Sequence, residues 1–313
     1  MYALTRLLGR SPNPILANRL FKQLIVPISL HAVESWLPYT HPRKVKQSSA
    51  TEAFTSQTCK LECDKLYNKF IRILYGLSSR SSDTKMKGEM GQYPVYIDAV
   101  TRVHGYMTHV TSRQAPELVK IATRVQKQLA TKVVHCWWNN ACSLIKTLPV
   151  NPERLSKSQK YRVREVLEKE YRIHWNQRLW EAGEEGRPFR SYRRYKQVFQ
   201  TEGYLTDLKG YTCINVLKFR LGDYKHVDDS SCPFCGNTTT PDPVHLTQCN
   251  HFQDAQLQHN VPTLPSEIHK ALEEAPNNMV DYICVVTKAI YLATKNKFKP
   301  KPKNPLKVNP LIT

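Results

Sequence analysis

Four residues toward the C-terminal end of the chain have the types and the spacing of a metal site. Two residues separate Cys232 from Cys235, nine separate Cys235 from His245, and three separate His245 from Cys249. Thiolate and imidazole groups are the ligands that tetrahedral zinc prefers, and four of them leave no open position for water. The pattern therefore predicts one structural zinc ion that does not hydrolyse a substrate.

The residues around these ligands indicate how the chain could bring them together. Gly236 directly follows the first pair, and its conformational freedom allows the backbone to turn beneath the two thiols. The four-residue step between His245 and Cys249 predicts that both side chains lie on one face of a short helix. We therefore expect a small zinc hairpin over residues 232–249.

Other interpretations of the cysteines and histidines remain open. His251 or His259 could replace His245 at a poorer spacing, or the residues could be unconnected. A disulfide between Cys232 and Cys235 would need an oxidising compartment, which nothing in the sequence indicates. Five further cysteines lack the regular spacing of a disulfide or metal framework and are typical of buried apolar positions: Cys59, Cys63, Cys136, Cys142 and Cys284. Because Cys59 and Cys63 lie at helical spacing, a second metal site there is an alternative.

The chain is strongly basic. It has 46 Lys and Arg residues against 26 Asp and Glu residues, a net charge of +20 and a pI near 9.6. Such a surface attracts polyanions, and we expect RNA and/or DNA as the partner. An anionic membrane surface and a purely solubilising role for the charge are the alternatives. Residues 1–10 contain no apolar run, and no stretch approaches the roughly 20 apolar residues of a spanning helix. We therefore expect an intracellular protein of the nucleus and/or cytoplasm without a membrane partner.

A segment rich in cations and aromatic rings lies before the metal motif. Phe189, Tyr192, Tyr195 and Phe199 recur at steps of three and four residues, with cations between them. Arginine and lysine contact phosphates, and tyrosine rings stack on the exposed bases of single strands. An amphipathic helix that packs these rings inward is an equal alternative. The predicted nucleic-acid-binding residues are Arg187, Arg190, Tyr192, Arg193, Arg194, Tyr195 and Lys196.

The elements that must position these residues are predicted to be mainly α-helical. The chain has 20 prolines and only 11 glycines, which favours helices separated by proline-marked turns over a strand-rich fold. Apolar periodicity predicts helices within residues 15–25, 61–77, 95–110, 116–148 and 155–182, with the longest helix in 116–148. In that helix, a stripe at four-residue spacing is expected to be buried: Ile121, Val125, Leu129, Val133 and Trp137.

Several segments outside the metal motif occur in a recognisable order. The chain begins with MYALTRLLG and continues through LIVPISLHAVESW (24–36), LYNKFIRILYG (66–76), GQYP (91–94) and KFRLG (218–222) before the Cys-Cys-His-Cys motif. This order resembles the C-terminal part, from the thumb onward, of a jockey-like non-LTR retrotransposon (LINE-type) reverse transcriptase. The likeness covers most of residues 1–255, and within it only the metal motif is specific by itself.

The resemblance implies a division into domains. Residues 1–148 would form a thumb-like helical domain, and residues 153–294 a second, basic helical region that contains the zinc hairpin. The stretch PVNP (149–152) marks the boundary between them. Residues 295–313 are expected to be a disordered basic tail.

The resemblance also implies a polymerase as the parent, but this chain lacks the carboxylates that such an enzyme needs. The family carries an aromatic-x-Asp-Asp box that binds two magnesium ions. The nearest string contains Asp228 and Asp229 without the aromatic residue, and we interpret it as a solvated loop. We therefore expect no enzymatic activity. The predicted function is that of a nucleic-acid-binding C-terminal fragment, with other retroelement proteins as further partners. A zinc-stabilised protein-interaction scaffold and a non-functional retroelement relic are the alternatives.

Overall fold

The computed structural model describes a helical protein. The described residues are 8, 13–40, 61–133, 135–146, 157–185, 192–223, 232–236, 243–262, 264–274 and 276–297. Among them the only extended pairing is an isolated bridge between Met90 and Thr201. The prediction of a mainly α fold is therefore confirmed. None of the helices in the described part of the chain is both long enough and apolar enough to cross a membrane.

The chain divides into two compact units, Met1–Gly210 and Tyr211–Thr313. The boundary predicted at residues 149–152 lies outside the described residues, and the helices before and after it belong to the first unit. The last helix of the second unit extends to Lys297, so the first three residues of the predicted tail are helical. Residues 298–313 lie outside the described part of the chain.

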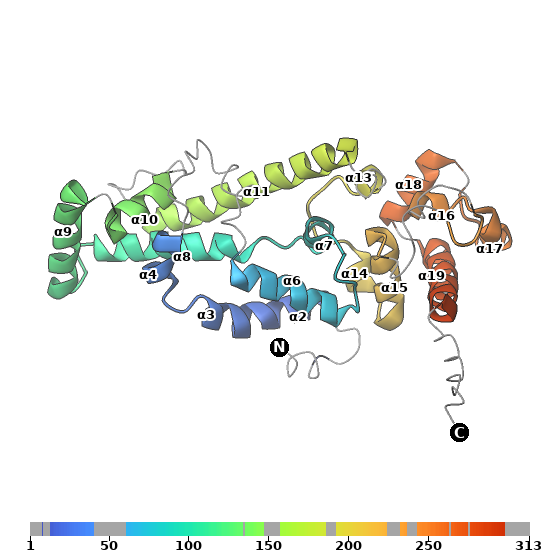
Figure 1. The fold of residues 1–313 in the computed structure, drawn as a ribbon, viewed down its shortest axis with the longest axis horizontal. Helices are drawn as coiled ribbons and strands as arrows, with labels where there is room; N and C mark the ends of the chain where they lie inside the picture. Colours follow the sequence, from blue (N-terminus) through green and yellow to red (C-terminus); the bar gives the residue numbers. More distant parts are fainter. Residues whose placement is uncertain are drawn as a thin grey trace, which may run out of the picture. The chain divides into compact units, whose positions relative to one another are not determined.

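The described residues of the first unit form α-helices and one π-helical turn (Figure 1). Helices α8 and α11 pack along each other, and α4, α6, α9 and α10 also contact α8. Its elements are α2 (Pro14–Leu20), the π-helical turn η1 (Phe21–Ile25), α3 (Val26–Ser29), α4 (Val33–Thr40), α6 (Glu62–Leu74), α7 (Asp83–Glu89), α8 (Val95–Val110), α9 (Glu117–Lys132), α10 (Trp137–Lys146), α11 (Lys157–Glu185), α13 (Tyr192–Tyr195) and α14 (Tyr204–Asp207).

The first helix begins where its sequence predicts. The Asn13 side chain accepts hydrogen bonds from the backbone N–H groups of Ile15 and Leu16, and Pro14 occupies the first helical position. Pro27 does not end this helix. The wider turn η1 directly precedes α3, which contains the proline, and such a π-turn relieves the clash between a proline ring and the preceding turn.

The prediction of one long helix within residues 116–148 is wrong. Helix α9 ends at Lys132, Val133 is extended, and α10 begins at Trp137. The Asn139 amide stabilises this corner, because its Nδ2 donates to the carbonyl oxygens of Ala130 (2.9 Å) and Val133 (3.1 Å). The longest described helix is α11, with 29 residues.

The apolar stripe of α9 is exposed, which contradicts the expected burial. Ile121, Val125, Leu129 and Val133 have relative exposures of 40–47%, and Leu118 is 81% exposed. Helix α9 stands across the end of α8, so only its opposite side contacts other helices (Figure 1). Among the described residues, α9 therefore contributes no fully buried side chain.

Gly88 shows how closely α7 packs against α11. A Cβ atom at this position would lie 2.5 Å from Cζ2 of Trp175, whose buried indole donates to the Thr84 carbonyl at 2.9 Å. We expect Gly88→Ala to lower the free energy of unfolding of the first unit by about 1–3 kcal/mol, because the indole cannot move without losing that hydrogen bond. Chemical denaturation measures the change.

Gly105 in α8 offers a matched control for this prediction. A Cβ atom at position 105 meets no atom within 4 Å. Because alanine is the better helix former, Gly105→Ala should stabilise the unit by about 0.5–1 kcal/mol. Equal effects of the two substitutions would show that the Trp175 contact does not limit the space at position 88.

The second unit contains the metal motif and is helical in its described part. Its core contains Val216 and Phe219 from one helix and Ile283 and Val286 from another, all at most 1% exposed. The buried guanidinium of Arg220 donates a hydrogen bond to the Leu272 carbonyl and ties two helices together. The elements are α15 (Gly210–Leu221), α16 (Pro243–Leu246), the 3₁₀ turn η3 (Asn250–Phe252), α17 (Gln253–Gln258), α18 (Pro265–Glu274) and α19 (Asn277–Lys297).

Candidate metal centre

Two short backbone segments present the four predicted ligands. Cys232 and Cys235 lie in a turn that Gly236 closes, with a positive φ of 71° and an N–H that donates to the Cys232 carbonyl at 3.0 Å. This conformation is the reason for glycine at position 236. His245 belongs to the single-turn helix α16, and Cys249 follows that helix in an extended conformation.

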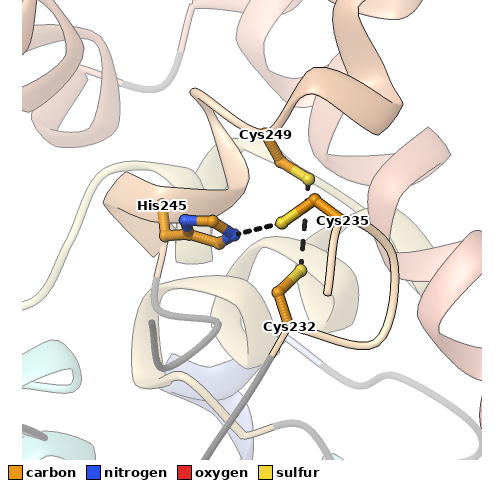
Figure 2. Close-up of side chains that lie close together, drawn as sticks. All are labelled: Cys232, Cys235, His245 and Cys249. Atoms are coloured by element: carbon orange, nitrogen blue, oxygen red, sulfur yellow. Dashed lines mark hydrogen bonds between the residues drawn. The ribbon is translucent and has the colours of Figure 1, made fainter. Parts of the chain in front are cut away.

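The four side chains converge on one point (Figure 2). Their nearest ligand atoms all lie within 4.8 Å of one another. The sulfur atoms of Cys232 and Cys249 are 4.0 Å apart, and Sγ of Cys235 lies 3.5 Å from Nε2 of His245. The cluster can therefore hold a metal ion through three sulfur atoms and one nitrogen atom.

One detail of the predicted geometry is wrong. His245 and Cys249 do not share a helix face, because α16 ends at Leu246 and a turn intervenes before Cys249. The histidine alternatives are also resolved, since the described cluster contains His245 and neither His251 nor His259. The His251 ring stacks on Phe234, with the ring centroids 5.1 Å apart. The cysteines of the cluster are free thiols, so no disulfide joins Cys232 to Cys235.

Side chains around the cluster fix its backbone. The Tyr282 hydroxyl of α19 donates to the Leu246 carbonyl at 2.6 Å, and Gln256 Nε2 of α17 donates to the Cys249 carbonyl at 3.1 Å. Phe234 makes an edge contact with Phe252, with the ring centroids 4.9 Å apart. Supporting groups of this kind orient metal ligands. The sequence motif predicts the four ligands, but Tyr282 and Gln256 carry no pattern that marks them as their supports.

The electrostatics of the cluster favour a bound cation. Cys232 and Cys249 are each only 1% exposed, whereas Cys235 and His245 are partly exposed. Burial and the neighbouring thiols Cys232 and Cys235 raise the pKa of the Cys249 thiol to about 12. Several thiolates can share this volume only when a cation neutralises them.

The structure places three aromatic residues of the predicted nucleic-acid segment, Tyr192, Tyr195 and Phe199, in the core, and Phe189 lies outside the described residues. Tyr192 and Tyr195 are 0% and 1% exposed, and their rings pack edge to face with centroids 5.5 Å apart. The Tyr192 hydroxyl donates to the Lys85 carbonyl at 3.1 Å. Because their faces are covered, these two rings cannot stack on bases. They pack inward, as the alternative of an amphipathic helix predicted.

The cations of this segment have different environments. Lys196 is 2% exposed and forms a buried ion pair with Glu202, so it is not available to phosphates. Arg193 lies over the Trp180 ring, 4.8 Å from its centroid, and Arg194 is exposed. Arg187 and Arg190 lie outside the described residues. Of the seven predicted contacts, Tyr192, Tyr195 and Lys196 are therefore wrong as surface residues.

A basic surface that the sequence pattern did not single out lies around α9. Between residues 111 and 133 the only acidic side chain is Glu117, whereas five side chains are basic: Arg113, Lys120, Arg124, Lys127 and Lys132. Arg113, Arg124, Lys127 and Lys132 are exposed. The excess of basic over acidic residues in this stretch can be seen in the sequence. The apolar stripe between the cations nevertheless predicted a buried helix.

Comparison of the chain with known protein families, with curated proteins and with solved structures gives no significant match.

Proposed function

We propose that this chain is a zinc-stabilised module that binds single-stranded nucleic acid, RNA and/or DNA, and that it does not polymerise nucleotides. The net charge of +20 supports the nucleic-acid part, and the Cys232, Cys235, His245 and Cys249 cluster supports the zinc part. The observation that carries the proposal furthest is the concentration of exposed cations around α9.

The distances in the cluster support zinc as the metal. In a tetrahedral site with zinc–sulfur bonds of about 2.3 Å and zinc–nitrogen bonds of about 2.0 Å, neighbouring sulfur atoms lie about 3.8 Å apart, and sulfur and nitrogen about 3.5 Å apart. Here the Cys232 and Cys249 sulfur atoms lie 4.0 Å apart, the Cys235 sulfur lies 3.5 Å from the His245 nitrogen, and all four ligand atoms lie within 4.8 Å of one another. Four protein ligands leave no position for a reacting water, so we assign the ion a structural role.

We also propose a descent from a jockey-like non-LTR retrotransposon reverse transcriptase, on the segment order given above. Asp228 and Asp229 lie outside the described residues, and their sequence context lacks the aromatic residue of the family's catalytic box. A reading frame that continues upstream of Met1 into an aromatic-x-Asp-Asp box would support this descent. A frame that continues without one would contradict it.

The salt dependence of binding tests the nucleic-acid function. Each cation that neutralises a phosphate of a single strand contributes about −0.7 to the slope of log affinity against log salt. Replacing Arg113, Arg124 and Lys132 with glutamine should therefore flatten the slope for a single-stranded oligonucleotide by up to about 2. Fluorescence anisotropy over a series of salt concentrations measures the slope.

The control removes the same charge from another surface of the same unit. Arg162, Arg172 and Arg178 are exposed on α11, where acidic residues alternate with the basic ones. Their replacement with glutamine should change the slope much less. Equal changes in both triple variants would contradict a binding surface at α9, and a wild-type chain without salt-dependent binding would contradict the function itself.

An interaction scaffold is the second candidate, because α9 exposes Leu118, Ile121, Val125 and Leu129. If this face joins two copies of the chain, the double variant Leu118→Ser, Val125→Ser should shift sedimentation toward the monomer. Under the nucleic-acid function alone, the same variant should leave both the solution mass and the salt slope unchanged.

A further inference from the structure

Four helices of the first unit line an open pocket with aromatic walls. It has a volume of about 360 Å³, within the range of small-ligand sites, and side chains of α4, α8, α9 and α10 line it. Four rings contribute to its walls: Tyr39, Tyr106, Trp137 and Trp138. Tyr39 and Tyr106 are 49% and 43% exposed, so a planar molecule can reach them from solvent.

The cavity also offers a hydrogen-bond acceptor. The Gln126 side chain lines it, and its buried amide oxygen accepts no hydrogen bond from any residue that the structure describes. The hydrogen of the neighbouring Thr123 hydroxyl is not available to a ligand, because it is donated to the Val119 carbonyl at 2.7 Å. A buried acceptor without a donor is costly, and a ligand N–H group placed here would satisfy it.

The walls are held in place before any ligand arrives. Trp137 Nε1 donates to the Glu34 carbonyl at 2.7 Å, which fixes this indole against α4. The Tyr106 ring meets Trp137 edge to face at 5.6 Å and an interplanar angle of 89°. Because these rings are already ordered, little conformational entropy is lost when a ligand stacks on them.

The charge beside the cavity is positive. The Lys127 ammonium lies over the Trp138 ring, 4.7 Å from its centroid, and Arg124 is exposed on the same helix. Aromatic rings, a hydrogen-bond acceptor and adjacent cations together match a nucleobase that is attached to phosphate.

We propose that this cavity binds one nucleobase of a single strand, with the base stacked on the aromatic walls and one of its N–H groups donating to Gln126. The inference rests on the proposed nucleic-acid function and identifies the cavity as the site that binds a base of the bound strand. A free nucleotide carries the same chemistry, and the experiment distinguishes the two sources.

The test compares an oligoadenylate with an abasic oligonucleotide of the same length and the same number of phosphates. Tyr39→Ala should weaken oligoadenylate binding about 5- to 150-fold, as expected when one stacked base is lost, and leave abasic binding unchanged. Trp138→Ala should act in the same way, and Gln126→Leu should weaken only the oligomer that carries bases. Circular dichroism verifies that each variant folds.

Tyr161→Ala is the matched control, because Tyr161 is an exposed ring (79%) of the same unit that does not line the cavity. It should bind both oligomers as the wild type does. If the folded Tyr39→Ala and Trp138→Ala variants also keep wild-type affinity for oligoadenylate, the base site is overturned while salt-dependent binding at α9 can stand.

If the wild-type chain binds neither oligomer, the proposed nucleic-acid function is contradicted. Binding of adenosine monophosphate then tests the base site separately. Quenching of tryptophan fluorescence that Tyr39→Ala abolishes would assign the cavity to a free nucleotide. A wild-type chain that does not respond to the nucleotide would overturn the site.

Discussion

Cys249→Ser is expected to release the metal and unfold the second unit. A hydroxyl is a poor zinc ligand, and Cys249 is a buried member of the cluster whose backbone carbonyl is bound by Gln256. Structural zinc contributes about 10–16 kcal/mol of apparent binding free energy in small domains. That is comparable to the whole stability of a typical domain, about 5–15 kcal/mol. The unit should therefore not fold once one ligand is lost.

Hydrogen exchange measures this effect separately for each unit. Amides of α15 and α19 should lose protection in Cys249→Ser, whereas those of α8 and α11 should keep it, because the first unit has its own core. Cys284→Ser is the control, since this thiol lies outside the cluster and its described contact is with Asn215 at 3.9 Å. A folded second unit in Cys249→Ser, or equal unfolding in Cys284→Ser, would contradict the structural role of the metal.

Asp64→Ala is expected to destabilise the first unit by about 3–5 kcal/mol, because it leaves buried polar groups without partners. The carboxylate of Asp64 is 3% exposed and accepts hydrogen bonds from the backbone N–H groups of Val95 (2.9 Å) and Tyr96 (3.3 Å). These N–H groups belong to the first turn of α8, whose N-cap residue is Pro94 and lacks a capping side chain. Asp64 thus caps a helix from a different element of the chain.

The same carboxylate also pairs with Lys87, whose Nζ lies 3.5 Å away. Burial opposes the charge on Lys87, but the carboxylate outweighs it and raises the pKa of the lysine. Without Asp64 the ammonium would therefore be left largely buried and unpaired. Urea denaturation of the first unit measures the loss of free energy.

Glu62→Ala tests whether the loss is specific to the buried carboxylate. Glu62 lies two residues earlier on α6, and its side chain is 86% exposed and paired with Lys65. Exposed pairs of this kind contribute roughly 0–1 kcal/mol. If Asp64→Ala costs no more than Glu62→Ala, the cap on α8 does not stabilise the unit.

The ligands of the metal centre could be predicted from sequence because their spacing is local. Residue types and short steps specify Cys232, Cys235, His245 and Cys249, and Gly236 marks the turn. The path of the chain between His245 and Cys249 could not be predicted in this way. A four-residue step suits a helix, but a turn also brings the sulfur and the imidazole together.

Periodicity predicted most helices, apart from the break after Lys132, but it did not always predict which side of a helix is buried. The stripe of α9 has the spacing of a buried face, yet burial depends on a neighbouring element, and α9 meets its neighbours with its other side. The opposite error concerns Tyr192 and Tyr195, where cations between the rings suggested a surface. Their burial depends on partners far away in sequence, such as the Lys85 carbonyl.

Metal content tests the central claim of the account most directly. Freshly purified protein, kept reduced, should contain about one zinc per chain by elemental analysis. Cobalt should replace that zinc and give the absorption of a tetrahedral site with thiolate ligands. Both signals should be lost in Cys249→Ser and kept in Cys284→Ser. A wild-type chain that folds with no zinc, or whose zinc survives in Cys249→Ser, would contradict the metal centre.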